Sequence, residues 1–294
     1  MREKCGDHAA WIASRITQIR YDVPVSGHVR IIGVLNVTPD SFYDGSRSFG
    51  VEEAIARAEW MLHDGADIIE LGGESTGPGS SVVSLEEERH RVIPALEAIR
   101  KAFPHASIAV DTCKAKIAAE AIAAGVTMIN DVTAGRNDPA MFTTVAGKAD
   151  LVLMYSKDPT PRTTKVPKQY EDVIATIHEF LAARKKAAID AGVPTDRIIL
   201  DPGLGHFVSA DPQYSFKVIA ELQRFADLQC PLLLSPSRKS FIAGPDQLGV
   251  GDRLPGTIAA SAIAVLHGAS FIRTHDVLAV KRACEIAEEV RLFS

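Results

Sequence analysis

The chain has 294 residues and a mass of 31.6 kDa, and its 46% hydrophobic and 23% charged residues are typical of a folded globular protein rather than a disordered or fibrous one. Its 32 lysines and arginines stand against 37 aspartates and glutamates, and the net charge of −5 argues against a nucleic-acid or anionic-membrane surface, which needs a basic face. The four cysteines form no Cys-x-x-Cys pair, and the sequence shows neither a secretion signal nor an apolar run of membrane-spanning length, so we expect a cytoplasmic protein with reduced thiols.

Short apolar runs rich in β-branched residues alternate with longer amphipathic segments along the chain. The runs are typical of strands buried on both faces, and the segments between them are typical of helices. We expect strands at residues 30–36, 66–72, 106–111, 126–131, 149–155, 197–203, 230–235 and 269–275. We expect helices at residues 51–65, 84–102, 114–125, 138–148, 172–192, 211–228, 256–268 and 277–293, several of them closed by a glycine.

Eight such strand–helix units predict an α/β protein of one domain, a (β/α)8 TIM barrel over residues 29–294. A barrel is preferred to a doubly wound open sheet, the alternative, because its usual size of roughly 250 residues accounts for these residues without a remainder. Residues 1–28 are left as an N-terminal extension, whose run WIASRITQIR suits a short helix against the barrel floor or a partner.

Polar residues stand where the predicted strands end. An isolated aspartate there caps a turn at least as often as it binds a ligand, but capping does not require polar groups at every strand end. Active sites of barrels are built at the C-terminal ends of the strands, so we expect these residues to meet at one mouth. They are Asn36, Glu70, Glu74, Asp111, Asn130, Asp131, Met154, Tyr155, Asp201, Ser237, Arg238, Lys239, Ser240, Arg273 and His275.

The residue types suggest two kinds of ligand group. Asp111, Asn130 and Asp201 offer acceptors and one amide, which suit a flat heterocycle rich in N–H groups, such as a 2-amino-4-oxopyrimidine. The first and last strands offer an oxygen ligand and two cations that suit a diphosphate with Mg²⁺, and the N-terminus of the last helix adds a positive dipole end. The residues of this second group are Asn36, Arg273 and His275.

The neighbourhoods of these residues resemble the signature motifs of the dihydropteroate synthases. The run GVLNVTPDSF at residues 33–42 matches the first motif, and LGGEST at residues 71–76 with Pro78 and Gly79 matches the second. Later motifs follow in order at residues 110–112, 129–131, 200–203, 237–240 and 273–276. The resemblance extends over about residues 29–290, and a ten-residue match such as the first is specific.

The resemblance implies a transferase of folate biosynthesis. The family joins 6-hydroxymethyl-7,8-dihydropterin pyrophosphate to p-aminobenzoate and releases 7,8-dihydropteroate and pyrophosphate. The implied mechanism is a dissociative substitution, in which the C–O bond to pyrophosphate breaks before the arylamine attacks. The resemblance also implies Mg²⁺ as cofactor, a homodimer formed through the last helices, no nucleic-acid or membrane partner, and sulfonamides as inhibitors.

Roles follow from motif position. The pterin would be held by Asp111, Asn130, Asp201 and Lys239, with Met154 packed on its ring. Asn36 would bind Mg²⁺, and Arg273 and His275 would hold the pyrophosphate. The p-aminobenzoate would be bound by Ser240 at its carboxylate, by Lys239 over its ring and by Thr76 and Pro78 in its pocket, with the loops at residues 37–50 and 75–82 closing over both substrates.

The sequence departs from the family pattern in three places. Gly77 stands where the family usually has arginine. His206, Phe207 and Val208 replace a Phe-Gly-Lys run, so that Phe207 stands where glycine is expected and the lysine is lost. Tyr155 begins a run that replaces His-Met-Arg. The run around Phe207 is similar to the sulfonamide-insensitive, mobile-element forms of the enzyme. We therefore hypothesise that Phe207 narrows the p-aminobenzoate pocket and excludes the bulkier drug by steric clash; drift without a phenotype is the alternative.

Two other functions remain open at the level of sequence. A non-catalytic pterin-binding protein is suggested by Gly77 and the lost lysine, and it would bind pterin without releasing pyrophosphate. A pterin-dependent methyltransferase barrel would share Asp111, Asn130 and Asp201. It would leave the motifs at residues 36–42 and 237–240 without a purpose.

Overall fold

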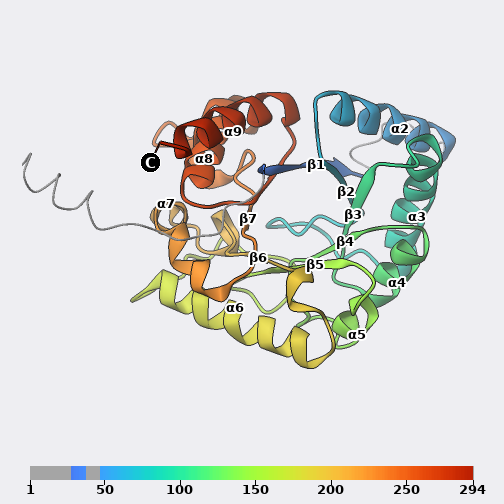
Figure 1. Ribbon diagram of the computed structural model, residues 1–294, viewed down its shortest axis with the longest axis horizontal. Coiled ribbons are helices and arrows are strands. Elements are labelled where there is room, and N and C mark those ends of the chain that lie inside the picture. The colour runs from blue at the N-terminus through green and yellow to red at the C-terminus, as the bar shows by residue number, and fades with distance from the viewer. Residues whose placement is uncertain (1–27, 38–46, 294) are drawn as a thin grey trace, which may run out of the picture.

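Eight parallel strands lie at the centre of the molecule, and the helices surround them (Figure 1). This computed structural model describes residues 28–37 and 47–293. Neighbouring strands pair in the order β6-β5-β4-β3-β2-β1-β8-β7. The ends of this sheet meet through one parallel bridge, between Leu200 and Leu232, and through the hydrogen bond from Leu200 N to the carbonyl of Pro231 (2.9 Å). The nearly closed sheet confirms the predicted (β/α)8 barrel and excludes the doubly wound alternative.

Each strand lies inside its predicted run and is as long as that run or shorter. The bounds are β1 Arg30–Asn36, β2 Ile68–Gly72, β3 Ser107–Asp111, β4 Met128–Asp131, β5 Asp150–Met154, β6 Ile198–Asp201, β7 Leu233–Leu234 and β8 Phe271–Thr274. The seventh strand is shortest because Pro231 and Pro236 flank it, and proline has no amide hydrogen for the ladder.

The helices alternate with the strands as predicted. They are α2 Arg47–His63, α3 Leu85–Ala102, α4 Ala115–Ala123, α5 Met141–Val145, α6 Val173–Asp190, α7 Pro212–Ala220, α8 Leu254–Leu266 and α9 Val277–Arg291. Short 3-10 segments follow some strands and helices: η2 Thr195–Arg197, η3 Gly205–Phe207, η4 Leu222–Leu228, η5 Ser240–Ala243 and η6 Val250–Arg253. The helix expected at residues 211–228 is thus divided into α7 and η4. None of the helices in the described ranges is long and apolar enough to cross a membrane.

The interior of the barrel is filled by one apolar layer to which each of the eight strands contributes one side chain. Its members are Ile32, Ile68, Ala109, Met128, Val152, Ile199, Leu233 and Phe271. A second and larger core lies between the strands and the helices. This layer therefore blocks the interior of the barrel, so a ligand that enters the mouth at one end does not reach the other end.

Two expectations fall outside the described residues. The predicted N-terminal extension is residues 1–28, of which only residue 28 is described. Residues 38–46, the greater part of the first loop expected to close over the substrates, also lie outside the described ranges.

Candidate active site

A polar layer lies directly above the apolar layer, toward the C-terminal ends of the strands. Successive side chains of a strand point to opposite faces, so the residue two positions after each member of the apolar layer points inward again. These positions carry Val34, Glu70, Asp111, Asn130, Met154, Asp201, Ser235 and Arg273. The sheet thereby brings together side chains that are far apart in the sequence.

A cavity of about 330 Å³ opens above this layer. Most of the predicted site residues line it: Asn36, Thr76, Asp111, Asn130, Met154, Phe207, Lys239, Arg273 and His275. Asp201 is buried beside Lys239, and Ser240 begins η5 directly after it. Pro78 lines a neighbouring hollow formed by the second loop, so the structure does not bring it into the cavity itself.

Arg273 is held between two carboxylates. Its Nε donates to Glu70 Oε1 (2.5 Å), and its Nη2 donates to Asp111 Oδ2 (3.0 Å). Burial lowers the pKa of Arg273, but Glu70 and Asp111 outweigh burial and raise it. One guanidinium thus pairs with a buried acid, Glu70, and a partly buried acid, Asp111. Burial together with the charge of Glu70 raises the pKa of Asp111 despite Arg273.

Asn130 lines the cavity and has one side-chain oxygen that is unpaired among the described residues. Its Nδ2 donates to Glu70 Oε2 (3.1 Å), and this bond fixes which end of the amide is the nitrogen. The opposite atom, Oδ1, is buried without a hydrogen-bond partner in the described part of the chain. An unpaired buried acceptor is costly, so the position favours a ligand that brings an N–H donor to it.

Asp201 and Lys239 form the opposite side of the site. A sharp turn holds Asp201, because Gly203 N donates to its Oδ1 (2.7 Å) and a Cβ at Gly203 would lie 2.5 Å from the carbonyl oxygen of Tyr155. Burial raises the pKa of Asp201 to about 6 against the effect of Lys239. Burial lowers the pKa of Lys239 to about 8 against the effect of Asp201. Both groups are thus close to changing charge near neutral pH.

His275 differs from the sequence-based expectation of a second cation. Burial and the nearby Arg273 lower its pKa to about 4, so the imidazole is neutral near pH 7. Its Nδ1 lies 3.0 Å from Ser237 Oγ, which also accepts from the backbone N–H of His275 (3.2 Å). The positive charge of the expected pair is therefore carried by Arg273 alone.

Asn36 ends β1 and lies exposed at the edge of the cavity. Across residues 28–37 and 47–293, no group of three His, Cys, Asp or Glu side chains could hold a metal ion. A Mg²⁺ ion at this edge would therefore take one ligand from Asn36 and the rest from phosphate oxygens and water, a pattern that magnesium commonly shows.

Sequence reasoning gave no role to Glu70, although it organises the site. The side chain is 0% exposed and bonds both Arg273 and Asn130. The available signal was an acid among isoleucine and leucine at an inward position of a strand, which a barrel interior tolerates only when the charge is paired. Ser237 was expected only as one of the polar residues at the mouth, and its hydroxyl lies beside His275 Nδ1.

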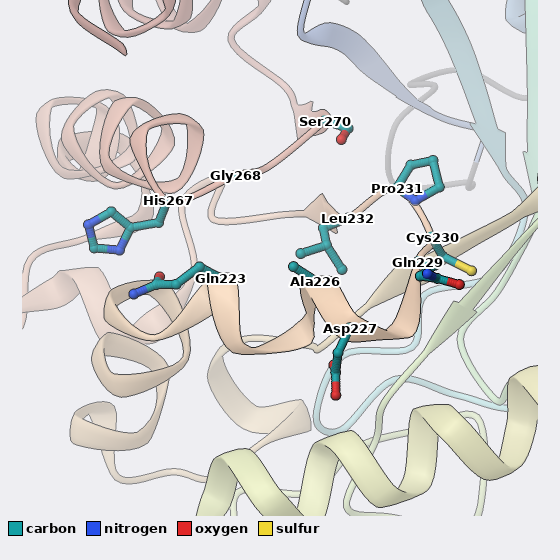
Figure 2. Close-up of a pocket in the computed structure, with 10 residues that line it drawn as sticks. All are labelled: Gln223, Ala226, Asp227, Gln229, Cys230, Pro231, Leu232, His267, Gly268 and Ser270. Carbon is teal, nitrogen blue, oxygen red and sulfur yellow. The ribbon is translucent and has the colours of Figure 1, made fainter. Parts of the chain in front are cut away.

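A second hollow of about 580 Å³ lies at the other end of the barrel (Figure 2). It is lined by η4 and by residues that precede β7 and β8, among them Gln223, Pro231, His267 and Ser270. None of the predicted site residues lines it. Residues at the N-terminal end of a barrel usually serve stability, so the mouth at Asp111 is the candidate site.

Comparison with known proteins finds similar chains over most of the sequence. The sequence model of the pterin binding enzyme family matches residues 32–275. The dihydropteroate synthase of Synechocystis is 37% identical over 260 residues, which are 88% of this chain and 89% of that protein.

Two solved structures have the same fold. A dihydropteroate synthase from Clostridium difficile, determined in the presence of pteroic acid, has a TM-score of 0.83 and 35% identity and covers 92% of this chain and 98% of its own. The enzyme of Xanthomonas albilineans with 4-aminobenzoic acid has a TM-score of 0.82 and 36% identity, with 90% and 93% covered.

Proposed function

The chain belongs to the dihydropteroate synthase family of pterin-binding enzymes, which are transferases of folate synthesis, and we propose how the mouth of its barrel divides the reaction among its residues. The substrates are 6-hydroxymethyl-7,8-dihydropterin pyrophosphate and p-aminobenzoate. The observation that carries the proposal is the polar layer, in which the unpaired Oδ1 of Asn130 lies beside paired carboxylates. A pterin edge alternates donors and acceptors and would satisfy these groups.

The pterin lies on the polar layer in this proposal. Asp111 and Asp201 accept its ring N–H groups, Asn130 accepts one more, and Met154 packs on the ring face. When the C–O bond breaks, its electron pair leaves with the diphosphate and a cation remains on the pterin methylene carbon. The carboxylates of Asp111 and Glu70 stabilise the positive charge that spreads into the ring. The arylamine nitrogen then forms the C–N bond and gives up its proton.

The diphosphate lies toward strands β1 and β8. Neutral His275 donates a hydrogen bond to the diphosphate from Nε2, because Ser237 occupies the Nδ1 side. Arg273 adds its positive charge as the pterin binds to the two acids that pair with this arginine. Mg²⁺, when bound at Asn36, would stabilise the negative charge on the leaving group. Exclusion of water from the closed mouth would protect the cation.

The p-aminobenzoate lies between the second loop and Phe207. Lys239 Nζ lies 5.2 Å from the centre of the Phe207 ring, so the two side chains form one wall of the cavity. Thr76 forms the facing wall, and Ser240 follows Lys239 at the start of η5, where it can receive the carboxylate. Phe207 lines the cavity, and we extend the proposal to sulfonamide tolerance on the steric ground that its ring would clash with the group that a sulfonamide carries beyond the position of the carboxylate.

A homodimer is part of the proposal. Apolar side chains are exposed along the last two helices, among them Leu278 (48% exposed) and Ile286 (67% exposed) on α9. Ile263 and Leu266 are exposed on α8, which packs against α9. A second copy of the chain would cover this surface.

A coupled assay of pyrophosphate release tests the function. Release should require both substrates and Mg²⁺, and Asp111→Ala should lose nearly all turnover because the ring loses a buried acceptor. Pterin binding without release would favour a non-catalytic pterin-binding protein. Methyl transfer to a corrinoid, without pyrophosphate release, would favour the methyltransferase barrel.

A further inference from the structure

The loop between β5 and α6 contacts both walls of the cavity proposed for p-aminobenzoate. The backbone N–H of Thr163 donates to the carbonyl of Thr76 (3.1 Å), in the second loop. The hydroxyl of Thr163 donates to the carbonyl of His206 (2.7 Å), the residue before Phe207. Thr163 is 2% exposed, so these bonds are shielded from water.

The same loop holds Phe207 at a second point. The backbone N–H of Lys157 donates to the carbonyl of Phe207 (2.8 Å). Together with the bond from Thr163 to His206, it satisfies two successive carbonyls of the short η3 turn. A 3-10 turn of three residues has little rigidity of its own, so the position of the Phe207 ring depends on these bonds.

Asp158 makes the loop rigid from within. Its Oδ2 accepts from the backbone N–H of Thr164 (2.9 Å) and lies 2.9 Å from the hydroxyl of Thr163. The Nζ of Lys157 donates to the same carboxylate (2.6 Å). Thr163 is thus held in place by one loop while it contacts two others.

The second loop is tied to this loop at another place. Arg162 donates to the carbonyl of Ser81 (2.8 Å) and forms an ion pair with Glu74. Glu74 also pairs with Lys114. The loop in which Gly77 replaces the family's arginine therefore receives a cation from a neighbouring loop.

We propose that Thr163 is a positioning residue that sets the width of the p-aminobenzoate pocket by joining the Thr76 wall to the Phe207 wall. The inference rests on the proposed function, since it concerns the same cavity. Thr163 does not line the cavity and acts through His206 and Thr76. It therefore affects selection among arylamines rather than pterin binding or bond cleavage.

Steady-state kinetics of Thr163→Val tests the inference. Valine keeps the shape and the backbone bond to Thr76 but removes the hydroxyl bond to His206, so the Phe207 wall is released. We expect the KM for p-aminobenzoate to rise on the order of fivefold, while kcat and the Kd for the pterin change by less than about twofold. The ratio of the sulfamethoxazole Ki to this KM should fall, because the wall that excludes the larger ligand yields.

Two control variants separate positioning from general stability. Thr163→Ser restores the hydroxyl and should restore the KM for p-aminobenzoate. Thr160→Val removes an exposed hydroxyl of the same loop, which donates to the carbonyl of Arg162 (3.0 Å), and should leave the KM and the drug ratio unchanged. If Thr163→Val does not fold, Asp158→Asn weakens the same contacts and decides the question by the same two measurements.

The outcomes are distinguishable from failure of the proposed function. A wild-type protein without pyrophosphate release would contradict the function itself. A wild-type protein that turns over normally, with an unchanged KM for p-aminobenzoate and an unchanged drug ratio in Thr163→Val, would overturn the role of Thr163 and leave the function standing.

Discussion

Glu70 shows how one buried acid can set the chemistry of several neighbours. It pairs with Arg273, orients Asn130 and, by its charge, raises the pKa of Asp111. The same carboxylate therefore decides which groups of the polar layer can accept hydrogen bonds from a ligand, and it influences how readily Asp111 ionises.

We predict that Glu70→Gln moves the acidic limb of kcat/KM to lower pH. Glu70 raises the pKa of both Asp111 and Asp201 by its charge, so both values fall without that charge and both acids stay ionised at lower pH. Pyrophosphate release measured against pH checks the shift. Glu97→Gln, on the exposed face of α3, is the control and should leave the profile unchanged.

Asp201 and Lys239 predict the shape of that profile in the wild-type enzyme. Asp201 must be ionised to accept from the pterin and has a pKa of about 6, whereas Lys239 must keep its proton and has a pKa of about 8. Ionisation of Asp201 should thus make kcat/KM rise through about pH 6, and Asp111, whose pKa burial raises to about 8, should extend this rise to higher pH. Loss of the Lys239 proton should make kcat/KM fall above about pH 8. Lys239→Arg should move the descending limb to higher pH, because a guanidinium keeps its proton, and a limb that stays near pH 8 would assign it to another group.

At this scale the sequence predicted positions better than charge states. Asp111, Asn130 and Asp201 were found because strand ends and inward positions follow from the order of residues. The neutral state of His275 was not, because it depends on burial and on Arg273. The role of Glu70 likewise depends on Asn130 from β4 and Arg273 from β8.

At the scale of elements, the β6–α7 loop carries one of the three departures from the usual family pattern. Phe207 ends η3 and lines the cavity beside Lys239. Its carbonyl and that of His206 are held by the β5–α6 loop, so the ring has a fixed support.

Phe207→Gly should make the enzyme sensitive to sulfamethoxazole. Removal of the ring opens the space beyond the carboxylate, and we expect the Ki to fall on the order of tenfold or more, with a smaller change in the KM for p-aminobenzoate. Phe216→Ala, on the exposed side of α7, should leave the Ki unchanged. Micromolar inhibition of the wild type that persists unaltered in Phe207→Gly would refute steric exclusion.

The last two helices predict the oligomeric state. Leu278→Glu combined with Ile286→Glu places charges on the exposed apolar face of α9 and should convert a dimer into monomers, because buried unpaired charges are costly. Analytical ultracentrifugation measures the change in mass. Trp60→Glu, at a 70% exposed position of α2, should not alter it, and a wild-type monomer would contradict the prediction.

Elements were predictable where periodicity is strong and less so where backbone chemistry intervenes. The spacing of apolar residues predicted α3 and α6 to within two residues. It overestimated β7, because the prolines at 231 and 236 limit pairing, and it gave one helix where the chain forms α7 and η4. The η3 turn was not expected, because its support comes from a loop distant in sequence.

For the molecule as a whole, the alternation of strands and helices was sufficient to predict the barrel. One apolar residue per strand closes the interior, and the position two residues later supplies the polar layer. The two-residue repeat of a β-strand therefore accounts for both the packed interior and the site above it. The sequence did not predict how unequal the strand contacts are around the circle. β1 and β2 pair over five positions, whereas β6 and β7 meet at a single bridge.

That single bridge has a consequence for motion. The most weakly paired neighbouring strands of the barrel are β6 and β7. Asp201 ends β6, and Lys239 follows β7. A pterin bound by Asp201 and Lys239 would connect the two strands across this weakly paired place. Deuterium should consequently enter the amide of Leu200 sooner than those of β1 in the empty protein, and occupancy of the mouth should slow its entry.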